Sequence, residues 1–549
     1  MAVRRVADVI VSALEAQGIT RVYCVPGESY LALLDALHGS SIKIIVCRHE
    51  SGAAFMAVAE AKMTGKATCA IVSRGPGATN AAIAFHVAEQ DAVPLVLLIG
   101  QVSREERGRG AFQEVDYTQF FGGMAKGVWE VNEAAKMGET LAMAFHRAQS
   151  GTPGPVAVSL PEDLLKDAAE GAEPKPYPAL RISAYAADAD AVLAMLEKAE
   201  RPLVIAGAGM RGPKGAAALA RFARAHHVPV ATTWKNQDVF DNHLPFYAGH
   251  LGFGNPAKHR DLLAGADLII AVGTRLGDVA SQNYQLPCAP EPAQPLIHIY
   301  PDAAPIGRVF RTRLGVVADP VGMLDLLAEK PTMTSSRKAW VEAIKGFMDD
   351  FMSFKPRQVS DGVDFGTVVA ALSKLAPSDA VITTDSGNVS TWLHRYWRLT
   401  PRHTLLGAIG GAMGFGVPGG VAAAMQAPDR TVITFVGDGG ILMTGQELAT
   451  AMQYGASVKI ILSDNGSYGT IRTHQERHFP ARVSGTELMN PDFTAWARSF
   501  GAQGVTVAPG DDVEAKVAQV LAHKGSSVLH VKSSRESLSA FTTLSALLK

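Results

Sequence analysis

Short apolar runs rich in β-branched residues alternate with segments of helical periodicity along this chain, in three successive stretches. The strands predicted in the first stretch are 21–25, 42–46, 67–73, 94–100 and 155–160. Those in the second are 203–206, 228–232, 268–272 and 296–300, and those in the third are 380–384, 431–436, 459–463 and 527–531. Strands that alternate with helices form parallel sheets, because each crossover carries the chain back along the sheet face. The pattern therefore predicts an α/β protein with three doubly wound parallel-sheet domains.

Two loose stretches divide the chain between these predicted sheets. A Pro-rich polar stretch covers 170–180, and a second stretch without periodicity covers 329–336. The 549 residues suffice for about three domains of ordinary size. We expect domains at 1–178, 185–330 and 358–549, of which the first and third are similar in size and pattern.

The composition excludes some partners and compartments. The formal net charge is −1, so the basic excess typical of proteins that coat nucleic acid or anionic membranes is absent. No apolar run reaches the length of about 18 residues that a membrane helix needs. The four cysteines form no Cys-x-x-Cys motif, and three of them fall in apolar runs. We therefore expect buried, reduced thiols and a cytoplasmic protein without nucleic-acid or membrane partners.

Polar residues suited to a metal diphosphate follow two consecutive strands of the third stretch. Strand 431–436 runs into Gly437-Asp438-Gly439-Gly440, and strand 459–463 runs into Asp464-Asn465-Gly466-Ser467. In one βαβ unit the two strand ends lie side by side at the edge where open α/β sheets bind ligands. Carboxylate and amide oxygens suit Mg²⁺, and glycines and a helix start suit phosphate. A bare Gly-Asp-Gly is at least as often a capped turn, but Asn465 at the next strand end favours the metal diphosphate.

The two strand ends resemble the fingerprint of thiamine diphosphate enzymes, with Asp464 in place of the first of two asparagines. The stretch from Gly437 to Ile471 is similar to acetolactate synthases in particular. The resemblance implies that Asp438, Asn465 and the backbone carbonyl of Ser467 bind Mg²⁺. It also implies that the residues around the diphosphate and thiazolium are Gly387, Asn388, Gly411, Met413, Gly437, Gly439, Gly440, Tyr468 and Gly469, with Met413 as the apolar wedge between the two rings of the cofactor.

The first stretch resembles the pyrimidine-binding domain of the same family through Arg48-His49-Glu50-Ser51-Gly52-Ala53-Ala54 and Gly75-Pro76-Gly77-Ala78-Thr79-Asn80. Taken alone, Glu50 at a helix start is more often a carboxylate that satisfies the helix dipole. The resemblance makes it the catalytic acid that hydrogen-bonds the pyrimidine N1′ and so activates the cofactor. Pro26, Gly27, Pro76 and Asn80 are implied as its neighbours. In the family the two cofactor-binding domains of one site come from different subunits, so a homodimer at least, and usually a homotetramer, is implied.

The second stretch contains a literal G-x-G-x-x-G, from Gly207 to Gly212, after a predicted strand. A dinucleotide fingerprint also needs an acid at the end of the second strand, but Thr233-Trp234-Lys235 follow strand 228–232. The pattern therefore argues against NAD. The resemblance to acetolactate synthases implies a non-redox FAD, with Gly249–Gly254 as a candidate lining, whereas pyruvate decarboxylases have a ligand-free scaffold domain here; both alternatives stay open.

The resemblance covers nearly the whole chain, including Ala111–Asp116 with Gln113 as a candidate active-site residue. Three departures bear on the reaction. Val279 stands where the synthases have the arginine that binds the second keto acid, and a charge-assisted bidentate partner is thereby lost. His474 replaces the tryptophan that contacts the acceptor. Glu28 resembles the acidic position of 2-keto acid decarboxylases and is a candidate proton donor.

The predicted function is therefore a carboligase or decarboxylase that uses thiamine diphosphate and Mg²⁺ on 2-keto acids or related aldehydes and ketones through an enamine. One alternative is a non-oxidative 2-keto acid decarboxylase or an acyloin lyase without acetolactate activity. An alternative of a different class is a catalytically silent, cofactor-binding regulatory protein, against which the presence of Glu50, Asp438 and Asn465 argues.

Overall fold

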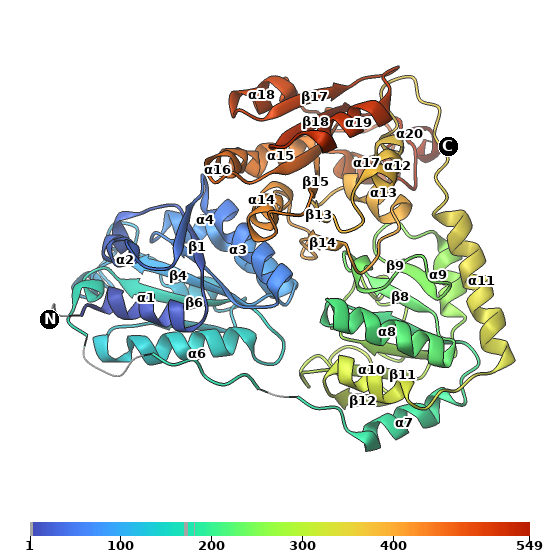
Figure 1. The fold of residues 1–549 in the computed structure, drawn as a ribbon, viewed down its shortest axis with the longest axis horizontal. Coiled ribbons are helices and arrows are strands. Elements are labelled where there is room, and N and C mark those ends of the chain that lie inside the picture. Colours follow the sequence, from blue (N-terminus) through green and yellow to red (C-terminus); the bar gives the residue numbers. More distant parts are fainter. Residues whose placement is uncertain (1–3, 170–173, 181, 549) are drawn as a thin grey trace.

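The structure is a computed structural model that describes residues 4–169, 174–180 and 182–548. Its described residues form three six-stranded sheets in which every strand pair is parallel, each covered by helices (Figure 1). The predicted fold class is thus confirmed. The predicted linker at 170–180 lies partly outside the described residues. No helix in the described part of the chain is long and apolar enough to span a membrane.

The first sheet has the strand order β2-β1-β3-β4-β6-β5. Its strands are β1 (Arg21–Cys24), β2 (Lys43–Val46), β3 (Thr68–Val72), β4 (Leu95–Gln101), β5 (Gly127–Glu130) and β6 (Val156–Pro161). Its helices are α1 (Val6–Ala16), α2 (Leu31–Leu37), α3 (Glu50–Thr64), α4 (Pro76–Gln90), α5 (Tyr117–Phe121) and α6 (Met137–Gln149). Cys24, Cys47 and Cys69 are buried in this domain as free thiols, as expected, whereas Cys288 of the middle domain is partly exposed.

The middle sheet has the order β12-β11-β10-β7-β8-β9, which is the nucleotide-binding order 3-2-1-4-5-6 read from its other edge. Its strands are β7 (Pro202–Ala206), β8 (Val230–Thr233), β9 (Tyr247–Leu251), β10 (Leu268–Val272), β11 (Leu296–Tyr300) and β12 (Leu314–Val317). Its helices are α7 (Ala186–Leu196), α8 (Pro213–His226), α9 (Ala257–Ala264), α10 (Pro320–Ala328) and α11 (Ser335–Phe351).

The third sheet has the order β14-β13-β15-β16-β18-β17. Its strands are β13 (Val381–Thr384), β14 (Thr404–Gly407), β15 (Val432–Gly437), β16 (Val458–Asp464), β17 (Gln503–Val507) and β18 (Ser527–Lys532). Its helices are α12 (Phe365–Leu375), α13 (Val389–Tyr396), α14 (Gly416–Gln426), α15 (Asp438–Thr444), α16 (Leu448–Gln453), α17 (Gly469–His478), α18 (Phe493–Ser499), α19 (Val513–Ala522) and α20 (Leu544–Leu547).

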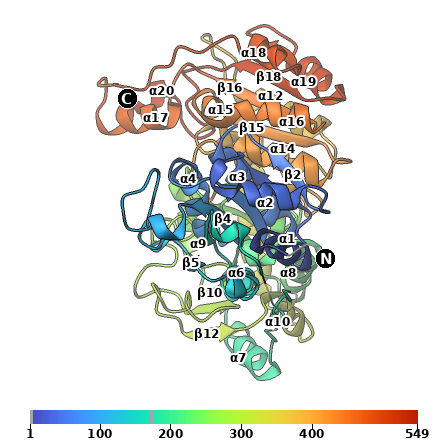
Figure 2. The ribbon, with the colours of Figure 1, turned by 90° about the vertical axis from the view of Figure 1, so that its left-hand side faces the viewer.

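One apolar core runs from the first domain into the third, whereas the middle domain has its own core. Helix α3 packs against α14 at this junction, where the rings of Phe55 and Phe415 meet edge to face with centroids 5.8 Å apart. Figures 1 and 2 show the first domain against the third, and the third resting on the middle domain. Two domains that share a core move as one body, so the first and third domains of a chain form a single rigid unit.

Candidate cofactor site

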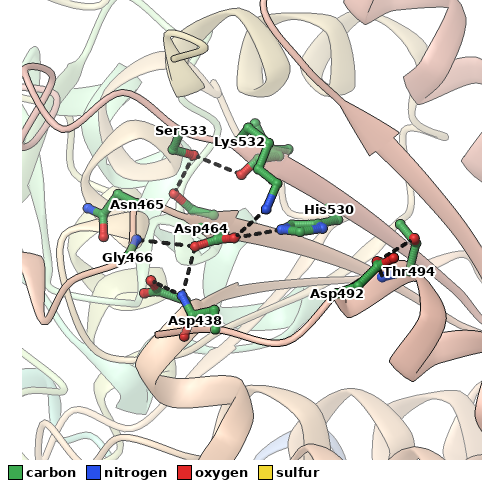
Figure 3. A network of polar contacts seen from close by, with 12 residues as sticks. Asp438, Asp464, Asn465, Gly466, Asp492, Thr494, His530, Lys532 and Ser533 are labelled. Atoms are coloured by element: carbon green, nitrogen blue, oxygen red, sulfur yellow. Dashed lines mark hydrogen bonds and ion pairs between the residues drawn. The ribbon is translucent and has the colours of Figure 1, made fainter. Parts of the chain in front are cut away.

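The predicted metal residues converge at the carboxyl ends of β15 and β16, which are paired as far as Gly437 and Ser463. Asp438 is the first residue of α15, directly after strand β15. The backbone N–H of Ser467 donates to Asp438 Oδ2 at 3.2 Å and to Asn465 Oδ1 at 3.1 Å. Because one amide reaches both oxygens, the two predicted ligands face the same small volume. Figure 3 shows Asp438 and Asn465 at the strand ends.

Two glycines of this loop are required by packing. A Cβ on Gly439 would lie 2.5 Å from Tyr468 Cε1, and one on Gly440 would lie 2.6 Å from Asp385 Oδ2. Any side chain at either position would displace the ring or the carboxylate beneath the loop. The Gly-Gly pair after Asp438 therefore keeps the loop close to β13 and α17, in addition to leaving room for phosphate.

The two acids of the site have opposite electrostatic settings. Burial, with the nearby charge of Asp464, raises the pKa of Asp438 to about 6. Burial by itself would raise the pKa of Asp464 as well. Hydrogen bonds from His530 at 2.7 Å and Lys532 at 3.0 Å nevertheless hold the pKa of Asp464 well below its usual range (Figure 3). Asp464 is thus an ionised structural carboxylate. Asp438, 3% exposed, is the acid that lacks a cationic partner among the described residues.

Asn490 joins the two acids, and sequence reasoning missed it. Its Nδ2 donates to Asp438 Oδ2 and to Asp464 Oδ1, both at 2.8 Å. The residue precedes α18 in an irregular segment and belongs to no motif, so only the folded chain identifies it. Asn490 fixes the orientation of the Asp438 carboxylate, as outer-shell partners of metal ligands do.

A pocket of about 250 Å³ opens beside Asp438. It is lined by all the residues predicted around the diphosphate, thiazolium and metal, which are Gly387, Asn388, Gly411, Met413, Gly437, Asp438, Gly439, Gly440, Asn465, Ser467, Tyr468 and Gly469. Sequence reasoning missed the lining residues Phe365, Trp392, Ser533 and Ser537, which carry no distinctive motif. The side chains of Phe365 and Trp392 make the pocket partly apolar.

The donor atoms of the pocket fit a magnesium diphosphate. The hydroxyl oxygens of Ser386 and Ser467 are buried without a hydrogen-bond partner. Buried polar groups are normally paired, so these two hydroxyls and the uncompensated Asp438 indicate a polar ligand. The available donors are oxygens, which Mg²⁺ prefers, and a single carboxylate leaves coordination positions for phosphate oxygens. These residues would hold the metal and the diphosphate of thiamine diphosphate.

The predicted pyrimidine-side residues form a second cluster, at the carboxyl edge of the first sheet. Glu50 is the first residue of α3, and Asn80 Nδ2 of α4 donates to Glu50 Oε2 at 2.9 Å. A Cβ on Gly27 would lie 2.6 Å from Ser73 Cβ, so the segment with Pro26 and Gly27 packs against the turn that leads to Pro76. Gln113 packs on Gly75 of that turn.

These pyrimidine-side residues do not line the pocket beside Asp438. Glu50 is half-buried, whereas Pro76, Asn80, Gln113 and Glu28 are exposed. His474, on α17, is also exposed and outside the pocket lining, with its ring stacked near that of His478. The single chain thus presents two separate clusters of candidate site residues, one around Asp438 and one around Glu50, which we call the two half-sites.

A carboxylate from the third domain supports the start of α3. Glu447, fully buried in the short helix η7 (Gly445–Glu447), accepts hydrogen bonds from the backbone N–H groups of Arg48 and His49, each at 3.0 Å. A Cβ on Gly52 would clash with Glu447 Oε1. The glycine two residues after Glu50 is therefore required by this interdomain contact, which no local pattern indicates.

The glycine-rich turn of the middle domain is explained largely by packing. Added Cβ atoms would lie 2.5 Å from Thr274 Cβ at Gly207 and 2.8 Å from Gly273 Cα at Gly209. A cleft of about 440 Å³ lies above this turn, lined by residues that include Gly209, Trp234, Asp278, Tyr300 and Arg308. The segment predicted as a FAD lining, Gly249–Gly254, does not contribute to this cleft.

Fold and site together define a class of protein. Each of the three sheets overlaps a match to a family model: the N-terminal TPP binding domain of thiamine pyrophosphate enzymes at residues 4–120, the central domain at 189–327, and the C-terminal TPP binding domain at 385–531. The matched segments contain both half-sites, with Glu50 in the first model and Asp438 in the third.

The relatives narrow this class. The acetolactate synthase large subunit of Parasynechococcus marenigrum is 32% identical over 94% of this chain and 85% of its own length. The large subunit of acetolactate synthase isozyme 2 of Escherichia coli is 31% identical over 96% of this chain and 95% of its own. The mitochondrial acetolactate synthase catalytic subunit of Saccharomyces cerevisiae is 30% identical over 94% and 79%. The chain belongs to the acetolactate synthase family of thiamine pyrophosphate enzymes.

Proposed function

We propose that this enzyme holds thiamine diphosphate and Mg²⁺ in the pocket beside Asp438 and forms or cleaves the carbon–carbon bond next to a carbonyl group. One observation carries the proposal: a single pocket gathers Asp438, Asn465 and Ser467 next to Met413 and the glycine loop. The bound cofactor supplies a thiazolium that stabilises a carbanion, which amino-acid side chains do not offer.

The residues have separable tasks in this proposal. Asp438, Asn465 and the carbonyl of Ser467 bind the metal, and the glycine loop leaves room for the diphosphate. Met413 supports the cofactor rings from the pocket wall. Glu50 holds a proton at the pyrimidine N1′, with Asn80 fixing its second oxygen at 2.9 Å. Substitution of Glu50 by Gln should strongly slow proton exchange at the thiazolium C2 but leave most of the cofactor binding. Unchanged exchange would favour the silent regulatory protein instead.

We infer that the functional unit is at least a homodimer, in which the first domain of one subunit closes the pocket of the other, and that a homotetramer is its assembled form. The inference is supported by the exposure of Asn80 and Pro76 and by large exposed apolar side chains near both half-sites. Phe112 is 77% exposed and Ile471 is 54% exposed. Apolar surface of this kind is typical of protein interfaces.

A hybrid experiment tests the shared site. Glu50→Gln and Asp438→Ala chains are each inactive alone and are co-expressed with different tags. In a hybrid dimer with shared sites, one site carries both substitutions and the other carries none, so activity returns. Sites built within single chains would give no active hybrid. Sedimentation equilibrium of the wild type distinguishes dimer from tetramer.

We propose 2-keto acids as donors and 2-keto acids, aldehydes or ketones as acceptors, in an acetolactate synthase-like carboligation. Val279 offers no charge to a second carboxylate, which favours an uncharged acceptor. The test is incubation with pyruvate and other 2-keto acids, thiamine diphosphate and Mg²⁺, with and without an aldehyde. CO₂ release without coupling would identify a decarboxylase, in which Glu28 is the candidate proton donor. Neither CO₂ nor a coupled product would leave an acyloin lyase as the better assignment.

The presence or absence of FAD in the middle domain distinguishes two forms of the enzyme. Purified protein with an absorbance band at about 450 nm, where bound flavin absorbs, would contain the FAD of the synthases. Protein without that band would have a ligand-free scaffold domain of the pyruvate decarboxylase type.

A further inference from the structure

Strand β14 is an edge strand of the third sheet, paired only with β13. Its outward backbone groups face the other two domains instead of a further strand. Buried backbone N–H and C=O groups need partners, and an unpaired sheet edge is a liability that proteins cover explicitly. Figure 1 shows β14 where the three domains meet.

Charged side chains of the other two domains take the place of the missing strand. Asp238 Oδ2 accepts from Leu405 N at 2.9 Å, and Arg211 Nη1 donates to Leu405 O at 2.7 Å. Lys62 Nζ donates to Gly407 O at 2.5 Å, and Lys235 Nζ donates to Ala408 O at 2.8 Å. Asp91 accepts from Ile409 N at 3.0 Å and from Gly410 N at 2.9 Å. We call these five side chains, Lys62, Asp91, Arg211, Lys235 and Asp238, the edge frame.

Burial of these charged side chains costs free energy, and a contribution to folding stability does not by itself explain their presence. Lys62 and Asp91 form an ion pair at 2.6 Å, and Arg211 and Asp238 form one at 2.8 Å. Lys235 is fully buried, and the only hydrogen bond that its ammonium group makes with the described residues is to Ala408 O. Replacement of buried ion pairs by apolar residues is often neutral or stabilising, whereas such pairs can specify one conformation. We therefore interpret the edge frame as a set of contacts that fixes the conformation of segment 405–410.

The segment held by the edge frame continues into the cofactor pocket. Residues Gly411 and Met413, which line that pocket, follow Gly410 directly. On their other side, Gly414 N donates to both oxygens of the buried Asp385 at 2.9 and 3.0 Å, and Thr444 Oγ1 donates to Gly414 O at 2.6 Å. Only Gly411, Ala412 and Met413 lie between the two fixed ends, Gly410 and Gly414. The position of Met413 is therefore set by these anchors.

We propose that the edge frame is a positioning device for Met413, and that Arg211, Lys235 and Asp238 are the contribution of the middle domain to catalysis. The proposal rests on the proposed function, in which Met413 supports the cofactor rings. It assigns the middle domain a mechanical task that needs no ligand in its own cleft.

Lys235→Met tests the proposal, because Met retains much of the side-chain length and removes the donor. We expect faster backbone hydrogen exchange over 405–414 in the cofactor-free protein, measured by mass spectrometry. In the holoenzyme we expect C2 proton exchange to fall by about 10–10²-fold, the range typical of misplacement near 1 Å, with a smaller change in cofactor affinity.

Lys459→Met is the matched control. Lys459 is also buried and donates to backbone carbonyls, those of His523 and Gly525, and burial lowers the pKa of both lysines to about 8. It lies away from the pocket lining, so its loss should alter neither segment 405–414 nor C2 exchange. Equal effects of the two substitutions would overturn the proposal.

A double-mutant cycle separates this proposal from the proposed function. Met413→Ala should itself lower C2 exchange, and its combination with Lys235→Met should be less than additive, because both act on one wedge. Additive effects would reject the edge frame. If Met413→Ala leaves C2 exchange unchanged, the role of Met413 in the proposed function is wrong. Should Lys235→Met fail to fold, Asp91→Asn, which weakens the anchors of Ile409 and Gly410, takes its place in the cycle.

Discussion

The first and third domains have the same strand order, 2-1-3-4-6-5 within each domain, and they place their candidate functional residues at the same positions. After the second strand come Glu50 in the first domain and Met413 in the third. After the third strand come the turn to Asn80 and the loop with Asp438. The helices after the second strands, α3 and α14, pack against each other in one core.

The difference between the two domains lies in what surrounds these equivalent positions. The third domain encloses a buried carboxylate, hydroxyls without a hydrogen-bond partner, and glycines in one pocket. This combination suits a cation and phosphate. The first domain presents a half-buried carboxyl and an exposed amide at a surface, which suits one edge of a ring brought by a partner. In the proposed shared site, one fold provides both halves, because loop residues, and not the strand order, determine the chemistry.

The largest effect is expected from the third domain. Asp438→Ala removes the only acid among the proposed metal ligands, and cofactor affinity should fall by more than the roughly 10–100-fold that loss of an outer-shell partner costs. Isothermal titration calorimetry with thiamine diphosphate and Mg²⁺ measures the loss. Wild-type protein treated with a chelator is the control and should behave in the same way. Retention of tight, Mg²⁺-dependent binding in the variant would move the metal elsewhere.

The corresponding change in the first domain should separate binding from activation. Glu50→Gln is expected to slow C2 proton exchange by about 10²–10⁴-fold, the usual contribution of a positioned acid or base, with little change in cofactor affinity. Exchange is followed by NMR after acid quench. Glu60→Gln, on the same helix but bonded to Tyr23, is the control and should leave exchange intact. An equal loss of cofactor affinity in Glu50→Gln would make Glu50 a binding residue only.

The contact between the two halves is tested at Gly52. Gly52→Ala forces a methyl group against Glu447 and should lower the free energy of unfolding by about 1–3 kcal/mol, as overpacking does. Urea denaturation measures the change. Gly346→Ala on α11, where a Cβ meets open space, is the matched control and should be neutral or slightly stabilising. Glu447→Ala in the Gly52→Ala background should recover part of the loss, and additive losses would contradict the contact.

The smallest effect is expected at Asn490. Asn490→Ala leaves Asp438 in place but removes the donor that orients it, so Mg²⁺ affinity should fall by about tenfold. Asp492→Ala, two residues further on, removes only the N-cap of α18 and should leave Mg²⁺ affinity unchanged. Identical Mg²⁺ titrations for both variants and the wild type would show that Asn490 does not orient the ligand.

The strands that the sequence did not reveal share one property. β5, β9, β12, β14 and β17 were not predicted, and each lies at an edge of its sheet. Strands buried on both faces have continuous apolar runs, whereas edge strands such as the sequence Tyr247–Leu251, with a glycine and a histidine, do not.

The family resemblance alone implied that Glu50 lies near the turn to Asn80. The sequence by itself determined the fold class and the adjacency of Asp438 and Asn465. These follow from local periodicity and from the rule that consecutive parallel strands end at the same edge. Only the tertiary structure decided that Glu447 supports the start of α3, that Asn490 orients Asp438 and that the edge frame holds the segment before Met413. These contacts join residues 52 to 399 positions apart, and no local pattern encodes them, because they depend on how completed domains pack together.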